Sequence, residues 1–139
     1  MPVISMSDFR IIVTGGRKRN SEDDYGTMAD VLDKLDPDGL IATHAVIIQG
    51  GCPDGADLLA RKVAEEFGIR VETYPADFKH HPENAVELSN QTMVDHGADL
   101  CLAFPNAPAD GPSLGTWDMI RRALAAGIKT RIYPEASHE

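Results

Sequence analysis

Short apolar runs alternate with amphipathic stretches along the chain. The runs are continuous enough for strands buried on both faces, and the amphipathic stretches place apolar residues at helical spacing. The predicted strands are Phe9–Thr14, Ala45–Gln49, Arg70–Tyr74, Leu100–Phe104 and Thr130–Tyr133. The predicted helices follow Ser21, lie between Asp54 and Gly68, run from about Glu83 to His96, and run from Leu114 to Ala126.

Strand and helix alternate five times without a repeat or a linker. This order predicts an α/β fold, in which a roughly five-stranded parallel sheet lies between two layers of helices. We therefore expect a single Rossmann-like, three-layer domain over residues 9–133, with flexible termini at 1–8 and 134–139. The Pro37-Asp38-Gly39 segment is typical of a turn.

The residues at the helix ends fit this assignment. Ser21 is predicted to cap the first helix, whose early acids Glu22, Asp23 and Asp24 suit the positive end of the helix dipole. Asp54 is predicted to cap the second helix, and Gly68 has the usual position of a glycine that ends one.

Glycine-bearing loops are associated with three of the predicted strands. They contain Gly15, Gly16 and Arg17 after the first strand, Gly50, Gly51 and Cys52 after the second, and Gly115 and Thr116 beyond the fourth. The carboxyl ends of parallel strands share one edge, and ligands bind there where the strand order reverses. Two of the loops also lead into helix N-termini, whose free amides favour anions. The sequence therefore predicts a site for a phosphate-bearing small molecule, although glycines at these turns can also serve the turn alone.

Charge narrows the class of ligand. The 139-residue chain has a formal net charge of −9, which argues against binding extended nucleic acid through many phosphate contacts. Arg17-Lys18-Arg19 forms one basic cluster beside the first glycine pair, which suits a single small anion. Arg17 is predicted either to pair with a phosphate or to be a solvated loop residue, and Lys18 and Arg19 are predicted to be solvated.

The composition gives no sign of a membrane segment, a signal peptide or a cofactor. Cys52 and Cys101 lie far apart and suggest reduced thiols in a cytoplasmic protein. Cys52 occupies a loop before a helix, where a thiol pKa can be lowered, but no histidine is evidently paired with it. His80 and His81 are adjacent and would point apart, so no metal site is predicted.

Three further side chains each have two interpretations. Asp57 can bond back to the glycine turn or accept a ribose hydroxyl. Trp117 can stack on a base or cover the edge of the core. Asp118 can stabilise positive charge on a ribose during glycosidic cleavage, or it can be an ordinary acid in the first turn of a helix.

Five segments together resemble a known family. They are Ile12–Arg17, Gly50–Ala60, Tyr74–Asp77, Ala98–Phe104 and Gly115–Met119, and they are similar to the YspA-related branch of the SLOG superfamily. The resemblance covers nearly the whole chain and implies a Rossmann-like fold that binds nucleotides or their derivatives. It extends to the LOG enzymes, which release a base from nucleoside monophosphates, and to the DNA-processing protein DprA. Members of this branch are often found in bacteria and phages.

The resemblance also implies site residues and departures from the LOG pattern. It places Asn90 at the pocket and makes a homodimer plausible. Where the LOG hydrolases carry an arginine before the pocket residue, this chain has Ser89. Where they carry a glutamate, it has Met119, and the nearest acid, Asp118, comes one residue earlier, about 100° around a helix.

Three functions follow from these observations. The first is a binding protein for a nucleotide or nucleotide derivative, acting as a sensor, a carrier or a sequestering agent. The second is a nucleoside-monophosphate N-glycosidase that uses Asp118 or Asp57. The third is a non-catalytic interaction module whose sheet is only a scaffold.

Overall fold

The computed structural model describes residues 8–35 and 44–134. The turn predicted at Pro37–Gly39 and most of the two predicted flexible termini lie outside these residues. The described elements are β1 (Phe9–Gly15), α1 (Glu22–Leu35), β2 (Ala45–Gln49), α2 (Gly55–Phe67), β3 (Arg70–Thr73), α3 (Ala85–His96), β4 (Leu100–Phe104), a short 3₁₀ helix (Pro108–Asp110), α4 (Leu114–Ala125) and β5 (Lys129–Ile132).

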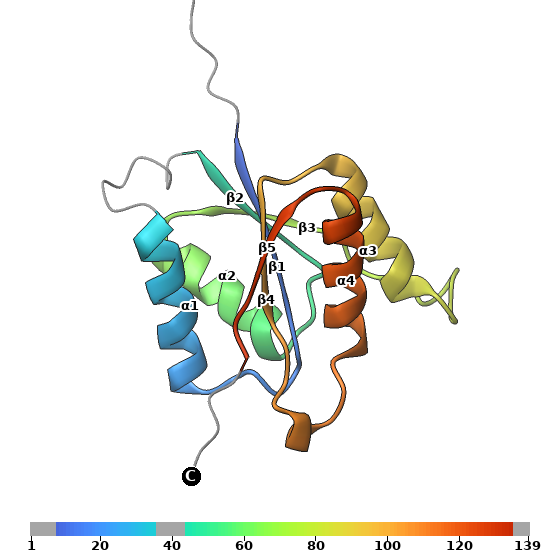
Figure 1. Cartoon of the computed structure of the whole chain (residues 1–139), viewed down its shortest axis with the longest axis horizontal. Coiled ribbons are helices and arrows are strands. Elements are labelled where there is room, and N and C mark those ends of the chain that lie inside the picture. Colours follow the sequence, from blue (N-terminus) through green and yellow to red (C-terminus); the bar gives the residue numbers. More distant parts are fainter. Residues whose placement is uncertain (1–7, 36–43, 135–139) are drawn as a thin grey trace, which may run out of the picture.

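The strands form one parallel sheet in the order β3-β2-β1-β4-β5 (Figure 1). The predicted Rossmann-like α/β fold is therefore confirmed. The chain moves outward from β1 to β3, then crosses to the other side of β1 and continues outward through β4 and β5. The strand order thus reverses between β1 and β4, and this is where such sheets bind ligands.

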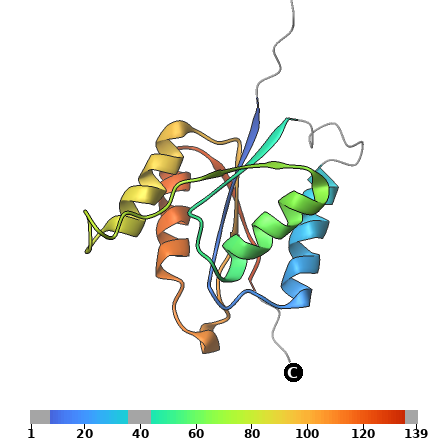
Figure 2. The ribbon, with the colours of Figure 1, turned by 180° about the vertical axis from the view of Figure 1, so that it is seen from behind.

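The helices cover the two faces of the sheet in pairs. Helices α1 and α2 lie on one face and α3 and α4 on the other, as the two opposite views show (Figures 1 and 2). Right-handed crossovers that run in opposite directions along a sheet require this arrangement. Each face has its own core: Met28 and Leu59 pack on one side, and Met93 and Met119 on the other.

The central strands are the most buried ones, as their unbroken apolar runs predict. Every residue of β2 and β4 is buried, whereas the edge strands β3 and β5 are largely exposed. Tyr74 and Tyr133, predicted as the last strand residues, lie one residue beyond β3 and β5. Their amides still donate to Gln49 and Ala103 of the neighbouring strands, both at 2.8 Å. The predicted strand ends therefore differ from the observed ones by a single residue.

Two of the three predicted helix ends have the expected geometry. The Ser21 hydroxyl accepts the Asp24 amide at 3.0 Å, and Gly68 ends α2 with φ of +70°. Asp54 does precede α2, but the predicted capping hydrogen bond is wrong because its side chain makes none. The first turn of α2 is instead docked on the loop after β1, where the Ala56 amide donates to the Gly16 carbonyl at 3.2 Å.

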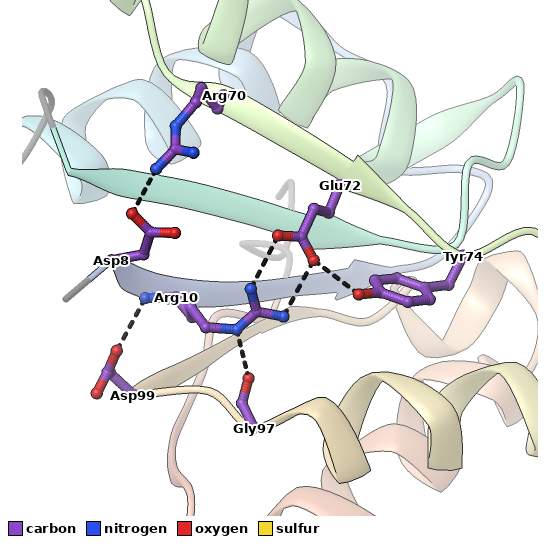
Figure 3. A network of polar contacts seen from close by, with 7 residues as sticks. All are labelled: Asp8, Arg10, Arg70, Glu72, Tyr74, Gly97 and Asp99. Atoms are coloured by element: carbon purple, nitrogen blue, oxygen red, sulfur yellow. Dashed lines mark hydrogen bonds and ion pairs between the residues drawn. The ribbon is translucent and has the colours of Figure 1, made fainter.

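A polar network attaches the C-terminal end of α3 to strands β1 and β3 (Figure 3). From β1, the Arg10 guanidinium donates to both carboxylate oxygens of Glu72 in β3, at 2.8 and 3.1 Å, and to the Gly97 carbonyl at 2.8 Å. The Tyr74 hydroxyl donates to the same carboxylate at 2.7 Å. The hydrogen bond from Arg10 holds the pKa of Glu72 below its ordinary value. The network fixes the C-terminal end of α3, whose other end contributes to the cavity described next.

Candidate functional site

A cavity of about 630 Å³ opens at the carboxyl ends of the strands, beside the point where the strand order reverses. It is bounded by the loops after β1, β2, β3 and β4, by the first turns of α2 and α4, and by one side of α3. The predicted ligand-binding residues that line it are Gly15, Gly16, Arg17, Gly50, Gly51, Cys52, Asp57, Asn90, Gly115 and Thr116. The separate glycine-bearing loops thus meet at one rim, although their contact with a ligand stays a prediction.

Trp117 and Asp118 are the two predicted site residues outside the cavity lining. Asp118 accepts hydrogen bonds from Arg122 at 2.8 Å and Asn90 at 3.0 Å. Partial burial pushes the pKa of Asp118 upward, but these hydrogen bonds outweigh it and the pKa is lowered overall. Each step along α4 turns a side chain by about 100°, so Thr116 faces the cavity while its two successors do not.

The glycines after β1 serve close packing between segments. A Cβ on Gly15 would lie 2.4 Å from the Ala56 Cβ and 2.7 Å from the Phe104 carbonyl oxygen. The side chain of Asn106 covers Gly16, and its oxygen accepts the Lys18 amide at 3.1 Å. The loop after β4 is therefore fastened to the loop after β1, and these two glycines are explained by packing before any ligand is considered.

The basic cluster divides into two kinds of residue. Arg17 and Lys18 are exposed, line the cavity and form no ion pair with any described residue. The prediction that Arg19 is solvated is wrong: its guanidinium is buried and forms an ion pair with Asp24 at 2.8 Å. Arg19 also donates to the carbonyls of Pro105 and Tyr133, at 2.8 and 2.7 Å. Only Arg17 and Lys18 therefore remain available to an anion.

The loop after β2 is organised by Asp57. Its carboxylate bonds back to the glycine turn, accepting the Cys52 amide at 3.0 Å. Gly51 turns the chain with φ of +77°, and Nε2 of the buried Gln49 side chain donates to the Asp57 backbone carbonyl at 2.9 Å. Burial raises the pKa of Asp57, and the Cys52 amide and the charge of Arg61 oppose the rise without cancelling it. The cavity thus contains a carboxyl group whose charged form is disfavoured by its surroundings.

We expect ionisation of Asp57 to lower the free energy of unfolding. Because its pKa in the folded state lies above the ordinary 3.8, the stability from its protonated form is present below that value and is lost as pH rises through the folded-state pKa. An Asp57→Asn variant keeps an oxygen for the Cys52 amide and does not titrate. Urea unfolding should therefore show the natural protein losing stability relative to this variant as the pH is raised from about 4 to 7. A pH-independent difference would contradict the expectation.

The first turn of α4 presents unused donors to the cavity. Within the described residues, the amides of Leu114, Gly115 and Thr116 have no hydrogen-bond acceptor, as is usual for the first turn of a helix. The Thr116 side chain is only 3% exposed, yet its hydroxyl bonds to no described residue. The preceding Ser113 hydroxyl accepts the Asn106 amide at 2.7 Å, which fixes the start of the helix. This combination favours an anionic group in the adjacent part of the cavity.

Phe78 and Asn106 are among the cavity residues that the sequence did not single out. Phe78 lies between a predicted strand and a predicted helix, and its only sequence signal is an aromatic residue isolated among polar ones. Asn106 begins a loop rich in proline and glycine, where no local pattern marks it. Its contact with Gly16 connects segments that no local pattern relates.

The histidine pair and Cys101 show no sign of a metal site or a reactive thiol. His80 pairs with Asp77 at 2.8 Å, and in residues 8–35 and 44–134 no cluster of His, Cys, Asp or Glu is arranged to hold a metal ion. Burial raises the pKa of Cys101 to about 12, so this thiol is unreactive near neutral pH. No helix in the same residues is long and apolar enough to cross a membrane.

Comparisons with known proteins agree with this architecture. A family model described as the YspA, cpYpsA-related SLOG family matches residues 9–81, more than half of the chain. The Gene 61 protein of Mycobacterium phage D29 is 36% identical over 125 residues, which cover 86% of this chain and 91% of that protein. The structure of the Moco carrier protein from Chlamydomonas reinhardtii is similar with a TM-score of 0.55 at 19% identity. That likeness covers 92% of this chain and 78% of the other, and at such identity it supports the fold alone.

Proposed function

Since the chain belongs to the YspA, cpYpsA-related SLOG family, we propose that it binds a nucleotide or a nucleotide-derived small molecule as a sensor, carrier or sequestering protein. The observation that carries the proposal is the cavity at the strand-order reversal, into which the start of α4 presents unpaired amides and the buried Thr116 hydroxyl. Its volume of about 630 Å³ falls in the range of ordinary small-molecule sites, roughly 300–1,000 Å³.

The phosphate is held at the start of α4. The amides of Gly115 and Thr116 donate to its oxygens, the Thr116 hydroxyl adds another donor, and the helix dipole favours the negative charge. Arg17, on the loop after β1, lies at the same cavity and supplies a planar pair of donors. This arrangement reconciles an anionic ligand with a chain of net charge −9, because the attraction is local.

The rest of the ligand lies toward acceptors in the cavity. Asp57 and Asn90 both line it and belong to different helices. The buried carboxyl group of Asp57 is suited to a ribose hydroxyl, whose hydrogen bond would offset part of the cost of burying the charge. Nδ2 of the Asn90 side chain already donates to the Gly115 carbonyl at 3.1 Å, so Asn90 couples α3 to the phosphate end.

The positions and hydrogen-bond partners of Asp118 and Asp57 favour binding over glycosidic cleavage. Asp118, the proposed stabiliser of an oxocarbenium-like state, is bound by Arg122 and Asn90 and lies outside the cavity lining. Asp57 lines the cavity from the start of α2. Glycosidic cleavage is therefore the second candidate function. A pure interaction module requires neither the cavity nor the unpaired donors.

Calorimetry tests the proposal. The protein is titrated with the four 5′-mononucleotides, with cyclic nucleotides and with ADP-ribose, and at least one is expected to bind. An absence of binding across the panel would overturn the proposal. Chromatography of the same mixtures for free base separates the candidates, since a carrier or sensor leaves the ligand intact and a glycosidase releases the base.

An Arg17→Gln variant is expected to bind the mononucleotide about tenfold more weakly, because a charge-assisted hydrogen bond to phosphate is lost. Its stability should not change, as Arg17 is exposed and has no ion pair among the described residues. Arg121→Gln is the matched control: that arginine is also exposed but lies on α4 away from the cavity lining. Equal affinities for the two variants would remove Arg17 from the site.

A further inference from the structure

Phe78 is the one aromatic side chain among the described residues that line the cavity. Phe78 is 55% exposed, and apolar residues such as Ala76 and Val86 line the same cavity. Exposed single apolar residues are common on protein surfaces, so exposure alone carries little weight. An aromatic ring at the mouth of a cavity is different, because a bound ligand would cover the exposed surface.

The segment that carries Phe78 is a turn held by several hydrogen bonds. The Asp77 carboxylate accepts the His80 amide at 3.2 Å and pairs with the His80 ring nitrogen at 2.8 Å, and the Asp77 carbonyl accepts the His81 amide at 2.9 Å. The hydrogen bond from His80 holds the pKa of Asp77 below its ordinary value. On the other side of Phe78, the Ser89 hydroxyl donates to the Tyr74 carbonyl at 2.5 Å and fastens the start of the segment to α3. Phe78 is therefore presented by a hydrogen-bonded turn.

Three apolar residues line the cavity next to this turn, beside the polar Glu87, Ser89 and Asn90 of α3. Ala76, Val86 and Met93 line the same cavity from the β3–α3 connection and from α3. Val86 lies against the start of α4, since a Cβ on Gly115 would be 3.1 Å from the Val86 Cγ1. A ligand held by the α4 amides therefore has an apolar surface beside it, with Phe78 on the same cavity wall.

We propose that Phe78 is the base-stacking residue of this site, so that the ligand carries a planar heteroaromatic ring that lies on the Phe78 side chain. The inference rests on the proposed function, and it defines which end of the ligand faces the β3–α3 connection. A planar ring on a polar ligand fits this position because it can stack on Phe78 without hydrogen-bond partners from Ala76, Val86 or Met93. Trp117, the aromatic residue expected from the sequence to stack, is 42% exposed outside the cavity lining.

The test measures a nucleotide and its base-free counterpart on the same variants. Calorimetry is performed with AMP, GMP, CMP, UMP and ribose 5-phosphate. The natural protein is expected to bind at least one nucleotide more tightly than ribose 5-phosphate. The Phe78→Leu variant should lose about five- to 100-fold in affinity for that nucleotide, the size of one base–aromatic stack, and less than about twofold for ribose 5-phosphate.

Trp117→Leu is the matched control, because it removes another exposed aromatic ring that lies off the cavity. Its nucleotide affinity should equal that of the natural protein. Equal losses of nucleotide and ribose 5-phosphate affinity in Phe78→Leu would overturn the inference, since the turn would then matter only for the shape of the site. Ribose 5-phosphate bound as tightly as every nucleotide would also overturn it and leave the phosphate site standing. If the natural protein binds none of these five probes and also binds neither the cyclic nucleotides nor ADP-ribose, both the proposed function and this inference fail.

A fluorescence experiment provides a direct contact readout. Trp117 is the single tryptophan of the chain, so Trp117→Phe removes the background emission. Adding Phe78→Trp to that variant creates a reporter at the proposed stacking position. The nucleotide that binds should quench its emission and ribose 5-phosphate should not, whereas unchanged emission at saturating nucleotide would contradict stacking.

Discussion

Replacing Arg19 with alanine is expected to lower the free energy of unfolding by about 3–5 kcal/mol. The exposed fractions of the Arg19 and Asp24 side chains are only 3% and 7%, so the substitution leaves an uncompensated carboxylate in the interior. The carbonyls of Pro105 and Tyr133 lose their Arg19 donor as well. The effect is measured by urea unfolding as a shift of the midpoint at constant slope.

The two neighbouring basic residues are the natural controls. Arg17→Ala and Lys18→Ala should change the free energy of unfolding by no more than about 0.5 kcal/mol, because both side chains are exposed. An Asp24→Ala variant should resemble Arg19→Ala, and the double variant should be less destabilised than the sum of the two, as expected for coupled partners. A loss for Arg19→Ala as small as that for Lys18→Ala would show that the ion pair contributes nothing.

This contrast explains why the basic cluster could not be interpreted from its sequence. Arg17, Lys18 and Arg19 are equivalent in local pattern. What separates them is the position of the carbonyls at the ends of β4 and β5, which are 86 and 114 residues away in the chain. The hydrogen-bonded partners of a long side chain depend on tertiary structure, so only the location of the cluster at the strand end could be predicted.

The fold, in contrast, could be predicted because it depends on local hydrophobic patterns and on the order of the elements, not on distant side-chain contacts. Buried parallel strands need continuous apolar runs such as those of Ala45–Gln49 and Leu100–Phe104, and both strands have these bounds in the structure. Strand–helix alternation then requires a parallel sheet, and parallel strands bring their carboxyl ends to one edge. The convergence of the glycine-bearing loops thus follows from periodicity and topology, without knowledge of any side-chain contact.

Side-chain direction limits the prediction of the site itself. Thr116, Trp117 and Asp118 are consecutive, yet only Thr116 lines the cavity, because a helix turns about 100° per residue and its rotation about its axis is set by packing. A glycine is similarly ambiguous, because a turn, a close packing contact and a ligand contact all favour it. Gly16 and Gly55 show the packing role, since an added side chain at either would collide with another segment.

Replacing Gly55 with alanine is expected to destabilise the protein by about 2–5 kcal/mol. Its φ of +69° is unfavourable for any residue with a Cβ, which accounts for about 1–2 kcal/mol. The new Cβ would also lie 2.4 Å from both the Arg17 Cα and the Gly16 carbonyl oxygen, and overpacking of this kind adds about 1–3 kcal/mol. These contacts are backbone atoms, so no side-chain rotation can relieve them, and α2 must move away from the loop after β1.

Gly68→Ala separates the two contributions. Gly68 has nearly the same φ, +70°, but no heavy atom lies within 4 Å of its added Cβ, so only the conformational cost of about 1–2 kcal/mol applies. Chemical unfolding of both variants gives the packing contribution as the difference between their losses. Equal losses would mean that the start of α2 can shift to accommodate the Cβ without a loss of stability, and that this contact does not hold the rim of the cavity. A larger loss for Gly55→Ala would give the cost of placing a Cβ between the start of α2 and the loop after β1 at the rim of the cavity.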